Sequence, residues 1–183
     1  MKRLNKLKRK SGFTLAETLL AVLILLLVSG IVATGVPVAR NVYQKVVIGA
    51  NAQALLSTTV SALKDELGTA WDVSVTGDTV TYFSADTGAR SSIAKEDNTI
   101  QITEYTAYDP VGKDSNNTRT YALVSDAAST KQNLYVDYDS VAMSDDGNVV
   151  TFSNLAVTHN GSTLASLDKL EIKVFSAAAS GGT

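Results

Sequence analysis

Residues 8–39 read KRKSGFTLAETLLAVLILLLVSGIVATGVPVA, and they divide at Gly12 into a basic segment and an apolar run. From Phe13 to Ala39 there are 27 residues, among which Glu17 carries the only charge. As an α-helix this run is about 40 Å long, more than the roughly 30 Å hydrocarbon core of a bilayer. The stretch therefore predicts a helix that is able to cross a membrane.

The segment before Gly12 is uniformly basic. It contains no acidic residue and six basic ones: Lys2, Arg3, Lys6, Lys8, Arg9 and Lys10. Because the end of a membrane helix that carries the excess of Lys and Arg stays on the cytoplasmic side, the N-terminus is expected inside and the C-terminal part outside.

This succession of a basic leader, Gly12, Phe13 and, four residues later, Glu17 resembles the processing site of type IV prepilins and pseudopilins. The resemblance covers roughly residues 8–24. In that family a membrane peptidase cuts after the glycine, the new N-terminal residue is methylated, and the helix leaves the bilayer to join a filament. The resemblance implies cleavage between Gly12 and Phe13 and N-methylation of Phe13.

Glu17 is the unusual residue of the apolar run. A charged carboxylate costs about 2.5–3.5 kcal/mol near the centre of a membrane, so a compensating partner is expected. The resemblance implies that Glu17 pairs with the Phe13 amine of an adjacent subunit during assembly. The alternative is a solvated carboxylate near the membrane surface.

Two other interpretations of the N-terminus remain open. A secretory signal peptide would be cut near Ala33-Thr34-Gly35, but it leaves Glu17 unexplained and its apolar region is usually only about 7–15 residues long. The second alternative is an uncleaved signal anchor, which does not require Gly12, Phe13 or Glu17.

The helical pattern continues beyond Ala39 and predicts one helix from Phe13 to about Leu67. The apolar positions expected on its packing face are Val42, Val46, Ala50, Ala54, Leu55, Val60, Leu63 and Leu67. Pro37 removes a backbone hydrogen bond, and Gly30 and Gly35 weaken a helix locally. We expect a bend or a melted stretch at residues 30–37, with a simple proline kink as the alternative.

Residues 68–176 are rich in Thr, Ser, Val and Tyr and predict antiparallel strands joined by turns. The clearest hairpin pairs Trp71–Val75 with Thr79–Phe83, and alternating apolar residues recur at 134–138 and 170–174. The expected fold is α+β and pilin-like, with the long helix packed against one antiparallel sheet. Its parts are a leader (1–12), a transmembrane or filament-core helix (13–39), an amphipathic helix (40–67), a β-rich domain (68–176) and a flexible tail (177–183).

Composition excludes several classes of function. Loss of residues 1–12 would leave 10 basic residues (16 − 6) against 18 acidic ones, a net charge of −8, which argues against general nucleic-acid binding. The chain has no cysteine for a disulfide, a thiolate metal site or a nucleophile. Its single histidine, His159, precedes an Asn-Gly turn and is expected in a surface loop, and no catalytic set is evident, so we expect no enzyme.

Acidic turn residues provide only weak candidates for a metal site. Asp145 and Asp146 with Asn148, or Asp137 with Asp139, offer oxygen ligands for calcium, but neither set completes a known loop motif. Solvated acids are the favoured interpretation, so no metal or other cofactor is expected.

The expected function is that of a structural subunit of a type IV pilus or a related filament. The alternatives are a pseudopilin of a type II secretion or DNA-uptake system, and a non-polymerising, membrane-tethered extracellular binding module. The expected partners are prepilin peptidase, related pilin subunits, the lipid bilayer before assembly, and a membrane assembly platform. The chain has no phosphate-binding Gly-x-x-x-x-Gly-Lys loop, so a separate ATPase must supply energy. The expected location is the cytoplasmic membrane and then a filament at the cell surface.

Overall fold

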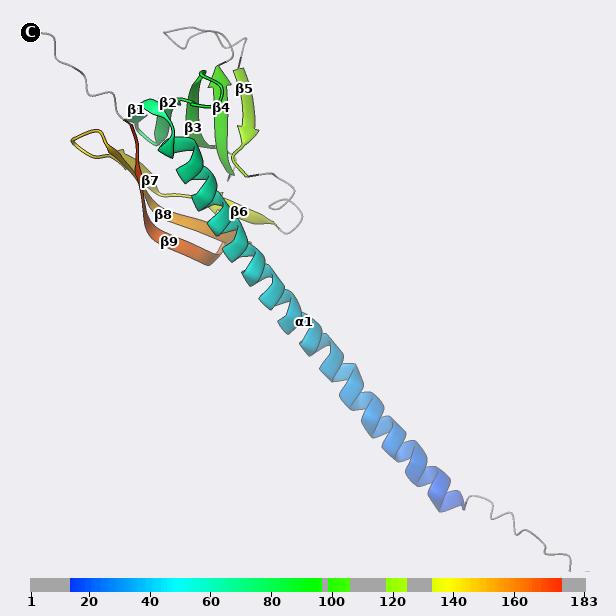
Figure 1. Ribbon diagram of the computed structural model, residues 1–183. Helices are drawn as coiled ribbons and strands as arrows, with labels where there is room; N and C mark the ends of the chain where they lie inside the picture. The colour runs from blue at the N-terminus through cyan, green and yellow to red at the C-terminus, as the bar shows by residue number, and fades with distance from the viewer. Residues whose placement is uncertain (1–13, 97–98, 106–117, 125–132, 176–183) are drawn as a thin grey trace, which may run out of the picture. The chain divides into compact units, whose positions relative to one another are not determined.

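The computed structural model describes residues 14–96, 99–105, 118–124 and 133–175 (Figure 1). In these ranges one helix precedes nine strands: α1 (Leu15–Gly68), β1 (Trp71–Thr76), β2 (Thr79–Phe83), β3 (Arg90–Glu96), β4 (Thr99–Tyr105), β5 (Thr118–Ala122), β6 (Leu134–Asp137), β7 (Ser140–Met143), β8 (Val149–His159) and β9 (Ser162–Lys173). All strand pairs between these elements are antiparallel. The predicted α+β, pilin-like fold class is confirmed.

Helix α1 runs without interruption through Pro37. Residues 30–37 are helical, so the structure shows no melted stretch there, and the bend stays a prediction. The chain divides into two compact units, residues 1–46 and 47–183, and α1 contributes to both.

The first sheet of the C-terminal unit is a simple meander with the strand order β1-β2-β3-β4-β5. The expected hairpin is present, and Gly77 in its turn has a φ of 61°, a conformation that glycine adopts at little cost. Figure 1 shows these strands in green beside the C-terminal end of α1.

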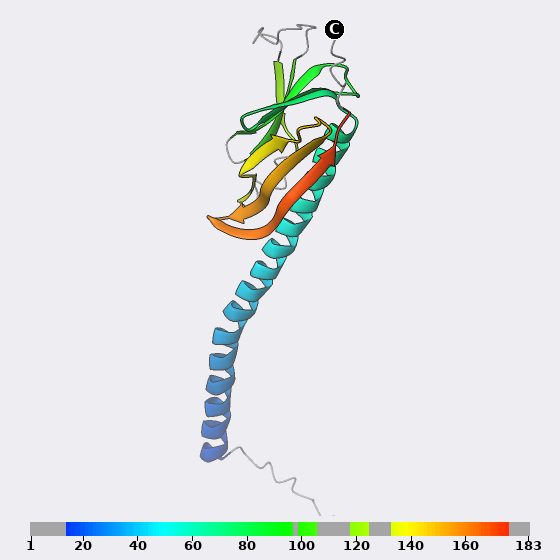
Figure 2. The same ribbon diagram turned by 90° about the vertical axis from the view of Figure 1, so that its left-hand side faces the viewer.

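A second sheet surrounds β8, so the expectation of one sheet was wrong. Strand β9 follows one edge of β8 along nearly its whole length, as Figure 2 shows in orange. The other edge takes two short strands in succession, β7 beside residues 150–153 and β6 beside residues 156–159. Because β8 has 11 residues, it is long enough to pair with both. The expected turn at Asn160 and Gly161, with φ values of 48° and 77°, joins β8 to β9.

The core lies between the second half of α1 and the two sheets. The buried helical residues share one face and are Ala52, Leu55, Thr59, Leu63 and Leu67. Leu55, Leu63 and Leu67 were expected on this face and are confirmed. The expectation was wrong for Val42 and Val46, which are 57% and 64% exposed. Buried Thr59 is satisfied because its hydroxyl donates to the carbonyl oxygen of Leu55 at 2.9 Å.

Polar contacts join the two sheets. The Lys95 ammonium of β3 pairs with an Asp137 carboxylate oxygen at 2.9 Å and donates to the Tyr138 carbonyl at 3.1 Å. The Tyr138 hydroxyl donates in turn to the Asp78 carbonyl oxygen at 2.7 Å. Tyr138 is almost fully buried and meets Phe152 edge to face, with 5.2 Å between the ring centroids. These contacts fix the β-rich part as one packed unit.

Candidate functional site

The first turn of α1 is closed by two of its own side chains. The Glu17 amide donates to the Thr14 hydroxyl at 3.3 Å, and the Thr14 amide donates to Oε2 of Glu17 at 3.4 Å. The Thr14 carbonyl oxygen accepts from the amides of Glu17 and Thr18 at 3.0 and 3.2 Å. Thr14 is therefore the N-cap residue and Glu17 the third helical residue of a capping box.

The capping box leaves much of the Glu17 carboxylate available. Only Oε2 takes part, through a long hydrogen bond, and the side chain is exposed. Within the part of the chain that the structure describes, no cation lies within ion-pair distance of this carboxylate. Gly12 and Phe13 lie outside the described residues, so their predicted cleavage and methylation stay predictions.

From Leu15 to Val46 the surface of α1 is mostly apolar and exposed. Its large apolar residues between Leu15 and Val46 are all at least half exposed, from 51% for Ile24 to 81% for Leu15. By length and composition α1 is able to cross a membrane, and it is the only such helix among the described residues. A folded domain does not leave this much apolar surface in water, so the segment needs lipid or other helices around it.

The hydroxyl groups in this apolar segment are bonded within the helix. The Thr18 hydroxyl donates to the Leu15 carbonyl at 2.9 Å, and that of Ser29 donates to the Leu25 carbonyl at 2.7 Å. Thr34 donates to the Gly30 carbonyl at 3.1 Å. Satisfied hydroxyls remove a large cost of placing the helix in hydrocarbon.

Gly30 and Gly35 are not required by packing within the described chain. A Cβ added at either position would meet no heavy atom within 4 Å apart from its chain neighbours and the backbone of its own helix. Together with Pro37, they stay the predicted location of a kink.

Asp146, one of the acidic candidates for a metal site, is already engaged in hydrogen bonds. Asp146 accepts hydrogen bonds from the Ser144 hydroxyl and from the amide and side chain of Asn148. The Ser144 hydrogen bond is the main reason that the pKa of Asp146 lies below its usual value. Asp145 is exposed, and among the described residues no three His, Cys, Asp or Glu side chains gather as a metal site.

His159 lies at the end of strand β8, so the expectation of a loop position was wrong. Its Nδ1 is 3.3 Å from the Asn133 backbone carbonyl oxygen, and its Nε2 is 3.1 Å from Nδ2 of the Asn160 side chain. The ring thus borders the β8–β9 turn.

Residues 7–33 match the family model described as the prokaryotic N-terminal methylation motif. The chain carries a type IV prepilin signal. This match extends the resemblance at residues 8–24 by one residue at its N-terminal end and by nine at its C-terminal end, and it includes Gly12, Phe13 and Glu17. No curated protein and no solved structure matches the chain.

The prepilin signal has several general consequences. It marks a pilin- or pseudopilin-like protein, which is a structural class and not an enzyme class. It implies processing by prepilin peptidase and assembly with other pilins. With the exposed apolar helix, it fits membrane anchoring before a filament forms.

Proposed function

We propose that this chain is a structural subunit of a type IV pilus or a closely related filament. Prepilin peptidase would cut it after Gly12, and the new N-terminal Phe13 would be methylated. The observation that carries the proposal is the methylation motif at residues 7–33, continuous with an apolar helix whose surface is open. The assembly platform and its ATPase would move this helix from the bilayer into the filament.

Glu17 would pair with the Phe13 amine of a neighbouring subunit. Oε1 makes no hydrogen bond to the described residues and is free to accept one from a neighbouring amine. The pair would neutralise the carboxylate as it enters a helical bundle, where an unpaired charge is costly. It would also fix the axial offset between subunits, since four residues correspond to about 6 Å of helix.

A pseudopilin of a secretion or DNA-uptake system would use the same processing and the same helix. The net charge of −8 expected for the processed chain argues against general DNA binding by this subunit. A membrane-tethered binding module without assembly would make no use of the free Glu17 oxygen, so we place it below both filament roles.

The location of the assembled protein tests the proposal. Cells that express the chain at its native level are sheared, and the released filaments are separated from the envelope. If the chain is the main component of long surface fibres, it is a pilus subunit. If it is found only in short filaments that stay with the envelope, it is a pseudopilin. A chain that stays entirely monomeric in the membrane would contradict the filament function.

A further inference from the structure

Two cations and a tyrosine stand among the exposed side chains that follow the apolar run of α1: Arg40, Lys45 and Tyr43. All three are exposed, with Tyr43 at 71%. Among the described residues Arg40 and Lys45 make no salt bridge, although Lys95 and Lys169 of the β-rich part each pair with an acid. Two free cations and a tyrosine thus mark the end of the apolar surface, and we call these three residues the outer collar.

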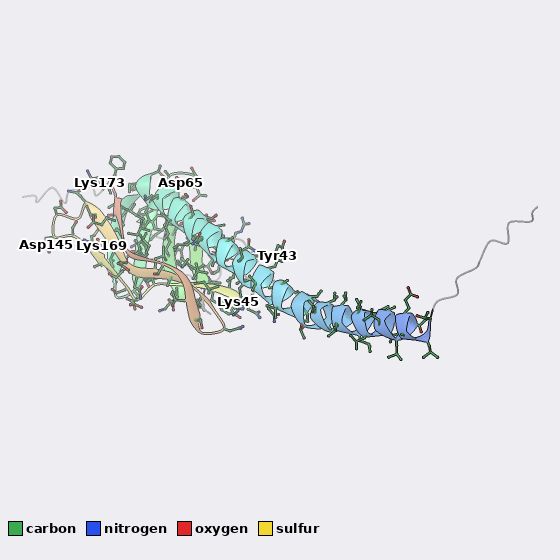
Figure 3. All side chains as sticks on the ribbon, turned by 90° about the horizontal axis from the view of Figure 1, so that it is seen from below. Tyr43, Lys45, Asp65, Asp145, Lys169 and Lys173 are labelled. Atoms are coloured by element: carbon green, nitrogen blue, oxygen red, sulfur yellow. The ribbon has the colours of Figure 1, made fainter. Side chains whose placement is uncertain are left out.

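The outer collar surrounds the helix and does not form one narrow patch. With about 100° per residue, Tyr43 and Lys45 point roughly 300° and 140° away from Arg40 around the axis. Figure 3 shows Tyr43 and Lys45 on different sides of α1. Side chains on several sides of a helix can all contact a planar surface through which the helix passes. They are less suited to binding a single small ligand.

The charge of the collar is local. Between Thr18 and Lys64 the chain has no acidic residue, although the processed protein would carry a net charge of −8. The collar therefore presents an uncompensated positive charge to whatever surrounds this part of the helix. Anionic headgroups complement it, and tyrosine favours the boundary between apolar and polar layers.

The distance to the other end of the span agrees with this placement. Arg40 follows Glu17 by 23 positions, a rise of about 35 Å in a straight helix. The hydrocarbon core is about 30 Å thick, so a helix with Arg40 at one headgroup layer has Glu17 near the other. At that depth the carboxylate avoids most of the cost it would have at the membrane centre.

We propose that the outer collar binds the phosphate groups of anionic lipids at the outer membrane surface and sets the insertion depth of α1 before assembly. The inference rests on the membrane stage of the proposed function and adds a lipid-binding surface to it. Each cation would contribute about 1 kcal/mol of attraction to an anionic surface. The depth fixed in this way would hold Glu17 at the inner headgroup layer until a neighbouring subunit arrives.

Single-cysteine labelling tests the proposal cleanly because the chain has no cysteine. Full-length protein with one cysteine at Val38, Val42 or Val46 is reconstituted into phosphatidylcholine vesicles containing one quarter phosphatidylglycerol, with the β-rich part outside. A membrane-impermeant maleimide should leave position 38 unlabelled and react at 42 and 46. In the Arg40→Gln/Lys45→Gln background, labelling at 42 should slow several-fold as the helix slides inward.

Matched controls keep the result specific. Lys64→Gln/Lys173→Gln removes the same charge elsewhere and should leave labelling at 42 unchanged. In vesicles of phosphatidylcholine alone, the labelling rate at position 42 should differ less between the collar variant and wild type. Equal labelling rates at position 42 for the collar variant and wild type in the anionic vesicles would overturn the proposal. An equally large change in labelling rate in both kinds of vesicle would also overturn it.

Two further outcomes separate this inference from the function on which it rests. A collar variant that labels like wild type in vesicles but fails to enter filaments would assign the collar to a protein contact, and would overturn lipid binding. Labelling of a cysteine at Leu25 would overturn the membrane span and the inference together. A chain that lacks processing after Gly12 but shows the expected labelling would overturn the filament function alone.

Discussion

Thr14 and Glu17 exchange two hydrogen bonds across the first turn of α1, at 3.3 and 3.4 Å. Glu17 thereby has a local role in capping its own helix, beside the role in assembly that we propose for its charge. The two roles differ in chemistry, because a neutral amide oxygen can also accept the hydrogen bond from the Thr14 amide. Glutamine at position 17 preserves the cap and removes the charge.

Substitutions at Glu17 distinguish the charge from the cap. We expect Glu17→Gln and Glu17→Ala to insert and to be cleaved as the wild type is, and both to lose about tenfold or more in filament incorporation. A tenfold loss corresponds to roughly 1.4 kcal/mol per added subunit. The measurement is the ratio of chain in sheared filaments to chain in the membrane. Normal incorporation of Glu17→Gln would assign the residue to capping alone.

Thr14 should stabilise the start of the helix without supplying a charge. Thr14→Ala removes the hydroxyl that accepts from the Glu17 amide, at a cost of about 1 kcal/mol. Amide hydrogen exchange of the first two turns in detergent should become several-fold faster, while Thr14→Ser should behave as the wild type does. Equal exchange in all three proteins would show that the cap does not stabilise this end.

The N-terminal segment was the most predictable part of the chain. Membrane helices depend on local composition, so the apolar span follows from residues 8–39 alone. The roles of Gly12, Phe13 and Glu17 come from the resemblance to prepilins and stay predictions. The capping box was missed, although Thr14-x-x-Glu17 is its ordinary signature. Glu17 had been explained only through the resemblance to prepilins, so its role in capping the helix was not considered.

The β-rich part was only partly predictable. Hairpins with a local turn, such as the one at Gly77, are visible in sequence, but the division into two sheets depends on pairings between distant strands. Strand β8 has a break in its alternation at Asn154, whose φ is 51°, and β3 contains few large apolar residues. The buried face of α1 was predicted correctly at Leu55, Leu63 and Leu67 but missed Ala52 and Thr59, which carry little apolar signal.

Leu63 anchors α1 to the core and provides a test of the packing. The side chain is fully buried, so Leu63→Ala should lower the free energy of unfolding by about 2–5 kcal/mol. Trp71, the only tryptophan, stacks on Phe83 with 4.3 Å between ring centroids and supplies a fluorescence signal for urea unfolding. The exposed neighbour Lys64→Ala serves as the control, and an equal, small effect of both changes would contradict the described core.

The β-rich part should lose stability in alkali. Burial raises the pKa of Tyr138 to about 12, with the nearby Asp78 charge adding to the effect, and burial with the Glu104 hydrogen bond raises that of Tyr121 to about 12. Burial and Glu66 raise the pKa of Tyr82 further. Above pH 10 the unfolded tyrosines lose protons that the folded ones keep, so the free energy of unfolding falls as pH rises from about 10 to 12.

Tyr138→Phe checks the alkaline effect. It loses the hydrogen bond to the Asp78 carbonyl, which should cost about 1 kcal/mol at pH 8, and its stability should fall less steeply between pH 10 and 12. Urea titrations of the full chain in detergent at pH 8, 10 and 11 measure both quantities. The same slope in variant and wild type would remove Tyr138 from the alkaline transition.

Processing at Gly12 is the step on which the whole account depends, and the mass of the N-terminal peptide measures it directly. The protein is isolated both from the native membrane and from sheared surface material, and the N-terminal peptides are compared. We predict that the peptide from sheared material begins at Phe13 and carries one added methyl group. A peptide that begins at Met1, or one that begins near residues 31–36, would contradict prepilin processing and with it the filament role of Glu17.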